Sequence, residues 1–344
     1  MNQPARKAQA HAAEPASDEL VLVAIDDGYA ETKLVANGVQ LSVPSIARAG
    51  THGVLQINED VKNSVRAYAM ENGETFTVGD GIEGERTQFD SYPYSTLNRA
   101  IVQHALQLAG FGGRRVRVAT GLPLEQFYEN LVPSARRIRD KKANLAQPVS
   151  ILGKGKAAVI VQQDVYSEAV AACIDFYLDD EGRPRDVSWP IAIVDIGGRT
   201  TDIATILDGE NIDMQRSGTA TLGVLDLYRD LDAGLRTAFS LSSPLSQQIV
   251  RNALTTGTVR LFNEVHDVAT HVAASRSHIE EALKREIDRR IGSGAELAAV
   301  VFVGGGARVF EGLPKLFAHS SIPDAPEFAN ARGMYKFMKH LQNG

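Results

Sequence analysis

The chain has 344 residues, of which 44% are hydrophobic and 23% are charged. That length is enough for about two domains with buried cores, and the balance is typical of a globular protein. The net charge of -6 gives no overall attraction to polyanions, so we expect no direct nucleic-acid partner.

The cysteine content and the apolar runs of the chain indicate the cellular compartment in which the protein works. Cys173 is the single cysteine, so no internal disulfide can form and the chain suits a reducing environment. Residues 1–18 hold no apolar run that could serve as a signal segment, and we interpret them as a disordered tail. No later stretch approaches the roughly 20 apolar residues of a membrane-spanning helix. We therefore expect a cytoplasmic protein with no membrane partner.

One pattern occurs twice in the chain, at residues 20–38 and 191–209. In each segment a short apolar strand ends in an acid and a glycine turn, after which alternating apolar residues resume. This pattern predicts a β-hairpin whose tip carries carboxylates.

The residues between the two hairpins predict further elements of both kinds. Apolar residues at helical spacing predict a helix over 96–109, and RRVRVATGLP at 114–123 predicts a strand. Residues 125–145 form a polar helix or loop excursion, and 148–166 contain two short strands around a Gly-Lys-Gly turn. The charged, Gly- and Pro-bearing segment 179–186 marks the crossover between two domains.

The last third of the chain predicts a long helix and then a strand that ends in glycines. The helical pattern spans 258–292, and Ser277 and Glu280 have the spacing of a capping box. The apolar run after it leads into Gly304, Gly305 and Gly306. A strand, a glycine turn and a helix start together form a cradle for a phosphate or a ribose.

The tip of the first hairpin carries Asp26, Asp27 and Gly28, and Lys33 follows on its second strand. Such carboxylates can hold hydrated Mg²⁺, the glycine lets the backbone approach a phosphate, and the lysine adds positive charge. Taken alone, an Asp-Asp-Gly turn is more typical of an ordinary acidic hairpin.

The tip of the second hairpin is more specific. It combines Asp195, Gly197, Gly198 and Thr200 with a further threonine and a further acid in one turn. Few structural requirements demand these residues together, whereas binding of phosphate and magnesium uses all of them.

Two common nucleotide sites are excluded by spacing. The glycine triplet does not continue as G-x-G-x-x-G, and no G-x-x-x-x-G-K-[ST] loop occurs anywhere in the chain. A zinc site is also disfavoured, because His266 and His271 do not share a helix face. The basic run at residues 136–142 is typical of a solvated face.

Six segments, in this order, carry a resemblance to a known family: VAIDDGYAETK, TGLPLEQFYEN, RDKKANL, VDIGGRTTDIA, VFVGGGA and ARGMY. With them the chain resembles the ParM/StbA-type plasmid segregation proteins of the actin-like ATPase superfamily. The resemblance implies an α/β, two-lobed fold of duplicated RNase H-like domains with a nucleotide cleft between them. Residues 19–182 with 319–344 would form lobe I, and 183–318 would form lobe II.

The resemblance also implies roles for particular residues. Asp26 and Asp195 would serve catalysis and hold Mg²⁺. The other nucleotide-binding positions would be Asp27, Gly28, Lys33, Gly197, Gly198, Thr200, Gly304, Gly305 and Gly306. Asp164 falls near the Glu or Gln that orients the attacking water in relatives, and Gln163 is a rival for that role. Arg199 replaces a small residue of the second turn, and it could face the nucleotide, a neighbouring subunit or water.

The implied function is an ATPase, with ATP and Mg²⁺, that forms a head-to-tail filament of identical subunits and disassembles after hydrolysis. Its role would be plasmid DNA partitioning, with a DNA-bound adaptor protein as the second partner. Two alternatives remain open: a non-filamentous small-molecule kinase of the same superfamily, and a nucleotide-binding scaffold without hydrolysis.

Overall fold

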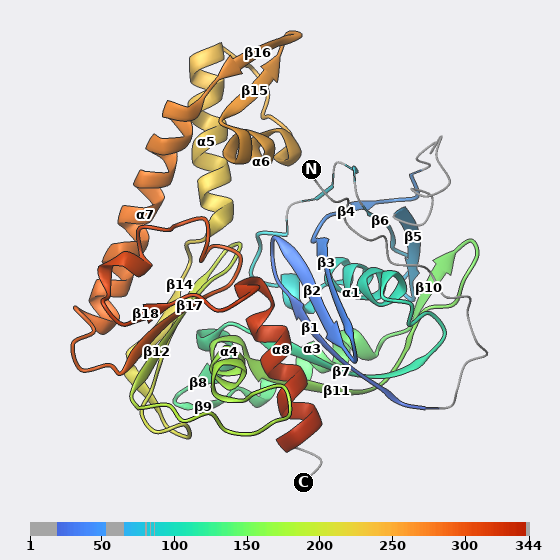
Figure 1. Cartoon of the computed structure of the whole chain (residues 1–344). Helices are drawn as coiled ribbons and strands as arrows, with labels where there is room; N and C mark the ends of the chain where they lie inside the picture. The colour runs from blue at the N-terminus through green and yellow to red at the C-terminus, as the bar shows by residue number, and fades with distance from the viewer. Residues whose placement is uncertain (1–18, 53–64, 80, 83, 86, 342–344) are drawn as a thin grey trace, which may run out of the picture.

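The structure is a computed structural model that describes residues 19–52, 65–79, 81–82, 84–85 and 87–341. The expected disordered tail at 1–18 lies outside these residues. Two α/β lobes stand side by side, and helices α4 and α8 lie between their sheets (Figure 1). Among the described residues no helix is long and apolar enough to cross a membrane.

Lobe I is built on a mixed sheet in the order β11-β7-β1-β2-β3. Strands β1, β2 and β3 are antiparallel neighbours, whereas β7 runs parallel to β1 and β11 parallel to β7. The strands are β1 Val21–Asp27, β2 Glu31–Ala36, β3 Val39–Pro44, β7 Arg115–Leu122 and β11 Val159–Ser167. The main helices are α1 Thr96–Leu108, α3 Ala135–Ala146, α4 Glu168–Tyr177 and α8 Ala329–Lys336.

Alternation along β1 supplies both faces of this sheet with apolar side chains. Val23 and Ile25 pack with Leu106 of α1 on one face. Ala24 packs on the other face with Met334 of α8. The small alanine allows α8 to come close to the sheet, which places the C-terminal helix beside the site at the end of β1.

A second, four-stranded sheet lies at the outer end of lobe I, in the order β10-β5-β6-β4. Its strands are β4 Ala47–Ala49, β5 Val65–Met70, β6 Thr75–Gly79 and β10 Val149–Leu152. The two strands predicted within 148–166 are therefore β10 and β11, which join different sheets. The polar excursion before them folds as helix α2 Leu124–Phe127, strands β8 Tyr128–Glu129 and β9 Val132–Pro133, and α3.

Lobe II repeats the arrangement of lobe I, as the repeated hairpin predicts. Its sheet has the order β14-β13-β12-β17-β18, with β12, β13 and β14 antiparallel and β17 parallel to β12. The strands are β12 Ile191–Ile196, β13 Thr201–Ile206, β14 Ile212–Ala220, β17 Ala299–Val303 and β18 Ser320–Ser321. Strand β18 lies just beyond the expected lobe boundary at 318, while α8 packs on lobe I.

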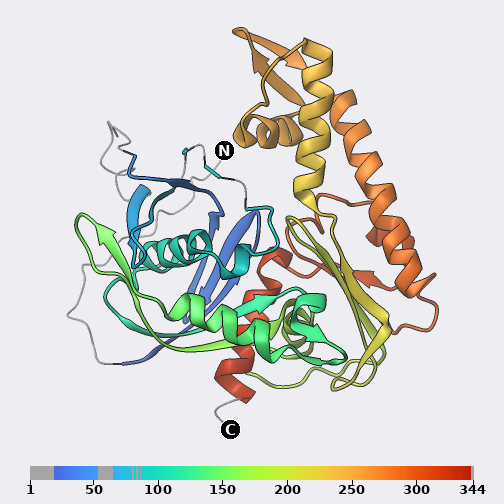
Figure 2. The ribbon, with the colours of Figure 1, turned by 180° about the vertical axis from the view of Figure 1, so that it is seen from behind.

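An arm of three helices and a small hairpin extends from lobe II, as the view from behind shows (Figure 2). It consists of α5 Val224–Phe239, α6 Gln247–Thr256, α7 Ala269–Ile291 and the strands β15 Thr258–Leu261 and β16 Glu264–Asp267. The predicted helix over 258–292 is thus wrong in its first eleven positions. Helix α7 already begins at Ala269, so Ser277 and Glu280 lie inside it and form no capping box.

Candidate functional site

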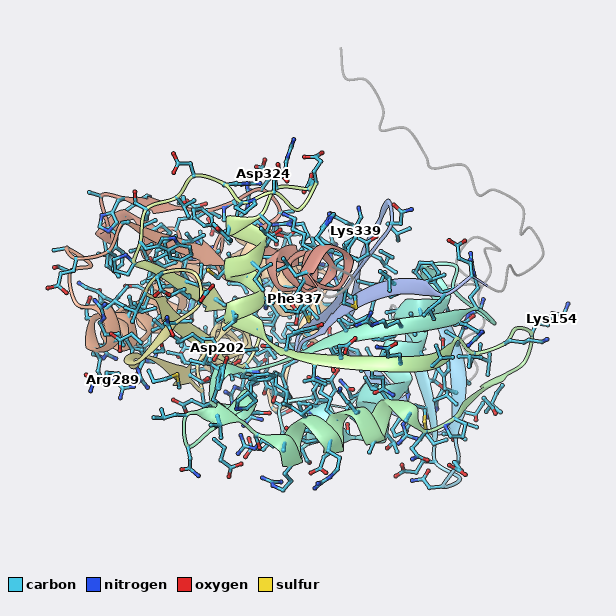
Figure 3. All side chains as sticks on the ribbon, turned by 90° about the horizontal axis from the view of Figure 1, so that it is seen from below. Lys154, Asp202, Arg289, Asp324, Phe337 and Lys339 are labelled. Carbon is cyan, nitrogen blue, oxygen red and sulfur yellow. The ribbon has the colours of Figure 1, made fainter. Side chains whose placement is uncertain are left out.

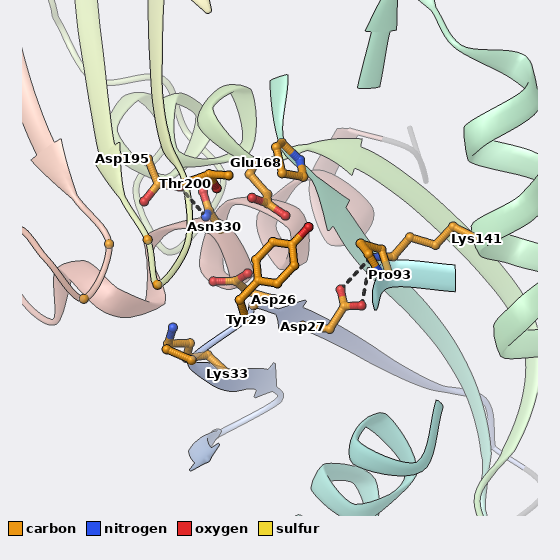
Figure 4. Close-up of a pocket in the computed structure, with 17 residues that line it drawn as sticks. Asp26, Asp27, Tyr29, Lys33, Pro93, Lys141, Glu168, Asp195, Thr200 and Asn330 are labelled. Atoms are coloured by element: carbon orange, nitrogen blue, oxygen red, sulfur yellow. Dashed lines mark hydrogen bonds and ion pairs between the residues drawn. The ribbon is translucent and has the colours of Figure 1, made fainter. Parts of the chain in front are cut away.

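The ends of the two central strands, β1 and β12, face each other across a pocket between the lobes (Figure 4). Every predicted site residue except Asp164 and Gly306 lines this pocket. The lining residues are Asp26, Asp27, Gly28, Tyr29, Ala30, Lys33, Pro93, Pro123, Lys141, Glu168, Asp195, Gly197, Gly198, Thr200, Gly304, Gly305 and Asn330.

Asp26 is buried at the carboxyl end of β1, opposite Lys33 in the register of the first hairpin. Burial raises the pKa of Asp26 to about 6; the positive charge of Lys33 opposes this shift, and the nearby carboxylate of Asp195 adds to it. Four carboxylate side chains and two lysines line the pocket, and this excess of acidic groups favours binding of a cation.

Asp27 points to the other side of the strand, into a buried network. Its carboxylate accepts hydrogen bonds from Nζ of Lys141 at 2.8 and 2.9 Å and from Nδ2 of Asn98 at 2.6 Å. Lys141 also donates to the carbonyl oxygen of Gly121 at 2.7 Å. The interpretation of residues 136–142 as a solvated face is thus wrong for Lys141, because α3 turns this one side chain towards the interior.

Asp195 occupies the matching position near the end of β12. Its Oδ2 accepts a hydrogen bond from Nδ2 of Asn330 at 2.7 Å, and burial raises its pKa while Asn330 and Lys33 oppose that shift. Asn330 lies in α8, one residue before the ARGMY segment. No local pattern indicates this contact, since Asn330 approaches Asp195 only through the packing of α8.

Glu168 is the carboxylate that the sequence reasoning missed. It is the first residue of α4 and lines the pocket, and burial together with Asp26, Asp202 and Asp195 raises its pKa well above the usual range. Gly121 makes room for it, because a Cβ there would lie 2.5 Å from Cγ of Glu168.

Asp164 and Gln163 lie away from this pocket. Strand β11 continues to Ser167, beyond the expected strand end at Gln163. Asp164 instead pairs with Nε of Arg117 on β7 at 2.8 Å. Neither residue therefore lines the pocket, whereas Glu168, four positions after Asp164, does, since the strand extends further than its apolar run.

The glycines leave space that side chains would fill. Gly304 has a φ of +80°, and a Cβ there would lie 2.3 Å from Oδ1 of Asp195. Gly305 has open space on its Cβ side, whereas a Cβ on Gly306 would collide with Ile196 beneath the turn. Gly304 and Gly305 thus keep the pocket open, while Gly306 permits close packing of the strand ends.

The residues present fit a nucleotide and Mg²⁺. Backbone amides at glycine turns bind phosphate, and buried carboxylate oxygens are the ligands that Mg²⁺ prefers. Among the described residues there is no group of three or more His, Cys, Asp or Glu placed to hold a metal directly.

Two family models match the chain. Residues 21–178 match the model described as plasmid segregation protein ParM, N-terminal, and residues 193–313 match that of the archaeal actin homologue MreB-like, C-terminal. The chain has an actin-like fold, and its N-terminal part matches the ParM/StbA family. No curated protein is significantly similar to it in sequence.

Solved structures share the fold of this actin-like chain. A 15-stranded ParM filament from Clostridium botulinum is 19% identical with a TM-score of 0.73, and the match covers 93% of this chain and 99% of that one. A non-polymerisable pCBH ParM mutant is 20% identical with a TM-score of 0.76, over 93% and 99%. An archaeal actin homologue in complex with ADP is 18% identical with a TM-score of 0.73, over 93% and 99%.

Proposed function

We propose that this actin-like chain binds and hydrolyses ATP with Mg²⁺ between its lobes and thereby assembles and disassembles a filament of its own subunits. The observation that carries the proposal is that Asp26, Asp195, Glu168 and the glycine turns line the same pocket between the lobes. The names of the related proteins add the biological context: one is a ParM filament, and another is an archaeal homologue in complex with ADP.

Different residues of the pocket would hold the metal ion and the phosphates. Asp26 and Asp195 would hold Mg²⁺, and Lys33 would add positive charge beside the phosphates. The amides of Gly28, Gly198 and Gly305, which line the pocket, would bind phosphate oxygens, because those of Gly197 and Gly304 already donate to the carbonyl oxygens of Thr200 and Pro326. Bound Mg²⁺ would neutralise the charge that develops on the phosphate oxygens during transfer.

Glu168 is the group that we assign to the attacking water. It lines the pocket, and its raised pKa makes its carboxylate a stronger base than that of a solvated Glu. Orienting the water and accepting its proton is an effect worth about 10²–10⁴-fold in rate. Asp164 cannot share this role without moving, because it is paired with Arg117 outside the pocket.

Loss of the terminal phosphate would remove a connection between the two hairpins and so change the angle between the lobes. In a head-to-tail filament, such a change alters the contact between neighbouring subunits. We propose that this cycle serves plasmid DNA partitioning in the cytoplasm, with a DNA-bound adaptor that recruits the filament.

The test follows light scattering and phosphate release together after Mg·ATP, Mg·ADP or no nucleotide is added. Wild-type scattering should rise with ATP and decay as phosphate appears. Glu168→Gln should bind ATP but release phosphate at least about 100-fold more slowly, so its filaments should persist. Asp164→Asn is the matched control and should hydrolyse at the wild-type rate.

The outcomes separate the alternatives. Phosphate release without scattering would favour the kinase of the same superfamily, and a panel of acceptor hydroxyl compounds would then identify its substrate. ATP binding without phosphate release would favour the scaffold. The absence of both binding and release would contradict the proposed function.

A further inference from the structure

Arg199 lies at the tip of the second hairpin, between residues that line the pocket, yet it does not line the pocket itself. Its side chain crosses to lobe I. Nη2 of Arg199 lies 2.6 Å from Oδ1 of Asp90, and the guanidinium carbon lies 5.4 Å from the centre of the Tyr29 ring. The residue that replaces a small side chain in this turn thus makes its contacts with the opposite lobe.

The lobe I side of this contact is a connected unit. The Thr87 hydroxyl donates a hydrogen bond to the carbonyl oxygen of Tyr29. The Tyr29 ring packs on Tyr92 at a centroid distance of 5.3 Å, and Tyr92 packs on Phe89 at 5.9 Å. Asp90 therefore belongs to a segment that is anchored to the first hairpin, and Tyr29 itself lines the pocket.

The lobe II side is equally well held. The carbonyl oxygens of Gly197 and Gly198 accept hydrogen bonds from the amides of Val224 and Leu225 at the start of α5. A Cβ on Gly198 would lie 2.6 Å from Cβ of Ala30, so the two hairpin tips touch beside Arg199. Any movement of the Arg199 backbone away from lobe I must therefore carry the hairpin tip and the start of α5 with it.

We propose that Arg199, Asp90 and Tyr29 form a latch that holds the two lobes together at the mouth of the nucleotide pocket and slows the release of bound nucleotide. In this arrangement Arg199 is a positioning residue, because its contacts are with the other lobe. The part concerning release rests on the proposed nucleotide site, whereas the contact between the lobes does not.

The contacts of Arg199 with lobe I are weak enough to break and form again as the lobes open and close. Asp90 is 91% exposed in its side chain, so solvent weakens its pairing with Arg199. The stacking on Tyr29 adds to this attraction. Nη1 of Arg199 is buried with no hydrogen-bond partner among the described residues, and opening would give that donor access to water. The latch is therefore reversible.

The first experiment measures release of a fluorescent ATP analogue, in the presence of Mg²⁺, after mixing with excess ATP in a stopped-flow instrument. Arg199→Ala should release it about tenfold faster than wild type, which corresponds to about 1.4 kcal/mol. Asp90→Ala should also speed release, by less, since Tyr29 still holds the guanidinium. The double variant should be no faster than Arg199→Ala alone, because both changes break one contact.

The matched control is Arg183→Ala, which removes an arginine paired with Asp179 and Glu181 within a single exposed loop. Its release rate should equal that of wild type. If Arg199→Ala weakens binding while Asp90→Ala changes nothing, Arg199 serves the nucleotide directly and the latch is refuted. Unchanged release in both variants refutes it as well.

A second measurement does not depend on nucleotide. Spin labels on Lys154→Cys in lobe I and Glu264→Cys in the arm report the distance between the lobes, while Cys173 stays unlabelled because it is buried and burial raises its pKa to about 12. Arg199→Ala should broaden this distance distribution towards longer values. If the wild type binds no ATP but the distribution broadens, the proposed function fails and the latch stands; an unchanged distribution refutes the latch.

Discussion

The ammonium group of Lys141 lies 2.8 Å from Oδ2 of Asp27, and both side chains are almost completely buried. A buried charge without a partner is far more costly than the pair itself. Lys141→Met should therefore lower the free energy of unfolding by about 3–5 kcal/mol, measured by urea denaturation.

Two further variants test this explanation. Combining Lys141→Met with Asp27→Asn should restore part of the loss, since no isolated charge then remains. Arg139→Ala, in an exposed position of the same helix, should change stability by less than about 0.5 kcal/mol. An equal loss in the single and double variants would mean that packing of the lysine chain, rather than its charge, is what matters.

Nδ2 of Asn330 donates a hydrogen bond to Oδ2 of Asp195 at 2.7 Å. A second pair of variants tests how this hydrogen bond affects magnesium binding. Hydrogen bonds to a ligating carboxylate fix its orientation, so Asn330→Ala should weaken Mg²⁺-dependent ATP binding at least about tenfold. Fluorescence titration with an ATP analogue at several Mg²⁺ concentrations measures this. Asn211→Ala serves as the control, because it removes only the exposed hydrogen bond from Asn211 to Asp208. This variant should bind ATP as the wild type does. A loss that persists unchanged without Mg²⁺ would argue against the assignment.

Asp202 predicts how stability depends on pH. It lies near the junction of the lobes (Figure 3) and accepts hydrogen bonds from the Thr219 hydroxyl and the amide of Leu124. Burial raises its pKa to about 8, with Thr219 opposing the shift. The folded chain therefore holds this proton more tightly than the unfolded chain, whose Asp titrates near its usual pKa of 3.8.

The consequence is a loss of stability as the pH rises. The contribution of Asp202 is fully present below about pH 4 and is lost as the pH rises to about 8, by at most about 1.4 kcal/mol per pH unit. Asp202→Asn should flatten the change in urea midpoint between pH 5 and pH 8. Asp208→Asn should leave that window unaltered, because hydrogen bonds from Asn211 lower the pKa of Asp208. A parallel pH profile in wild type and Asp202→Asn would overturn the prediction.

Gly333 lies where α8 crosses α4, and a Cβ there would come within 1.7 Å of the carbonyl oxygen of Ala171. Gly333→Ala should force the helices apart and lower the free energy of unfolding by about 3 kcal/mol. Gly234→Ala in α5 has no atom within 4 Å of the new Cβ and should stabilise by up to about 1 kcal/mol. Thermal unfolding compares the two, and equal effects would show that the helix contact does not limit stability.

Much of the pocket could be predicted from local sequence. Asp26, Asp195 and the glycines beside them sit at strand ends and tight turns, where neighbouring residues determine both the backbone and the direction of the side chain. Such features are readable because the whole motif lies within one hairpin. The repeat of the hairpin predicted the two lobes for the same reason.

Contacts between distant segments were decided by the tertiary structure alone. Lys141 is separated from Asp27 by 114 positions, and Asn330 from Asp195 by 135. Glu168 reaches the pocket because β11 continues past its apolar run before α4 begins, and Arg199 finds its partner only where the lobes meet. The sequence by itself determined the turns that line the pocket; the packing of α3, α4 and α8 decided which side chains surround them, because no local pattern records which helix face a sheet will bury.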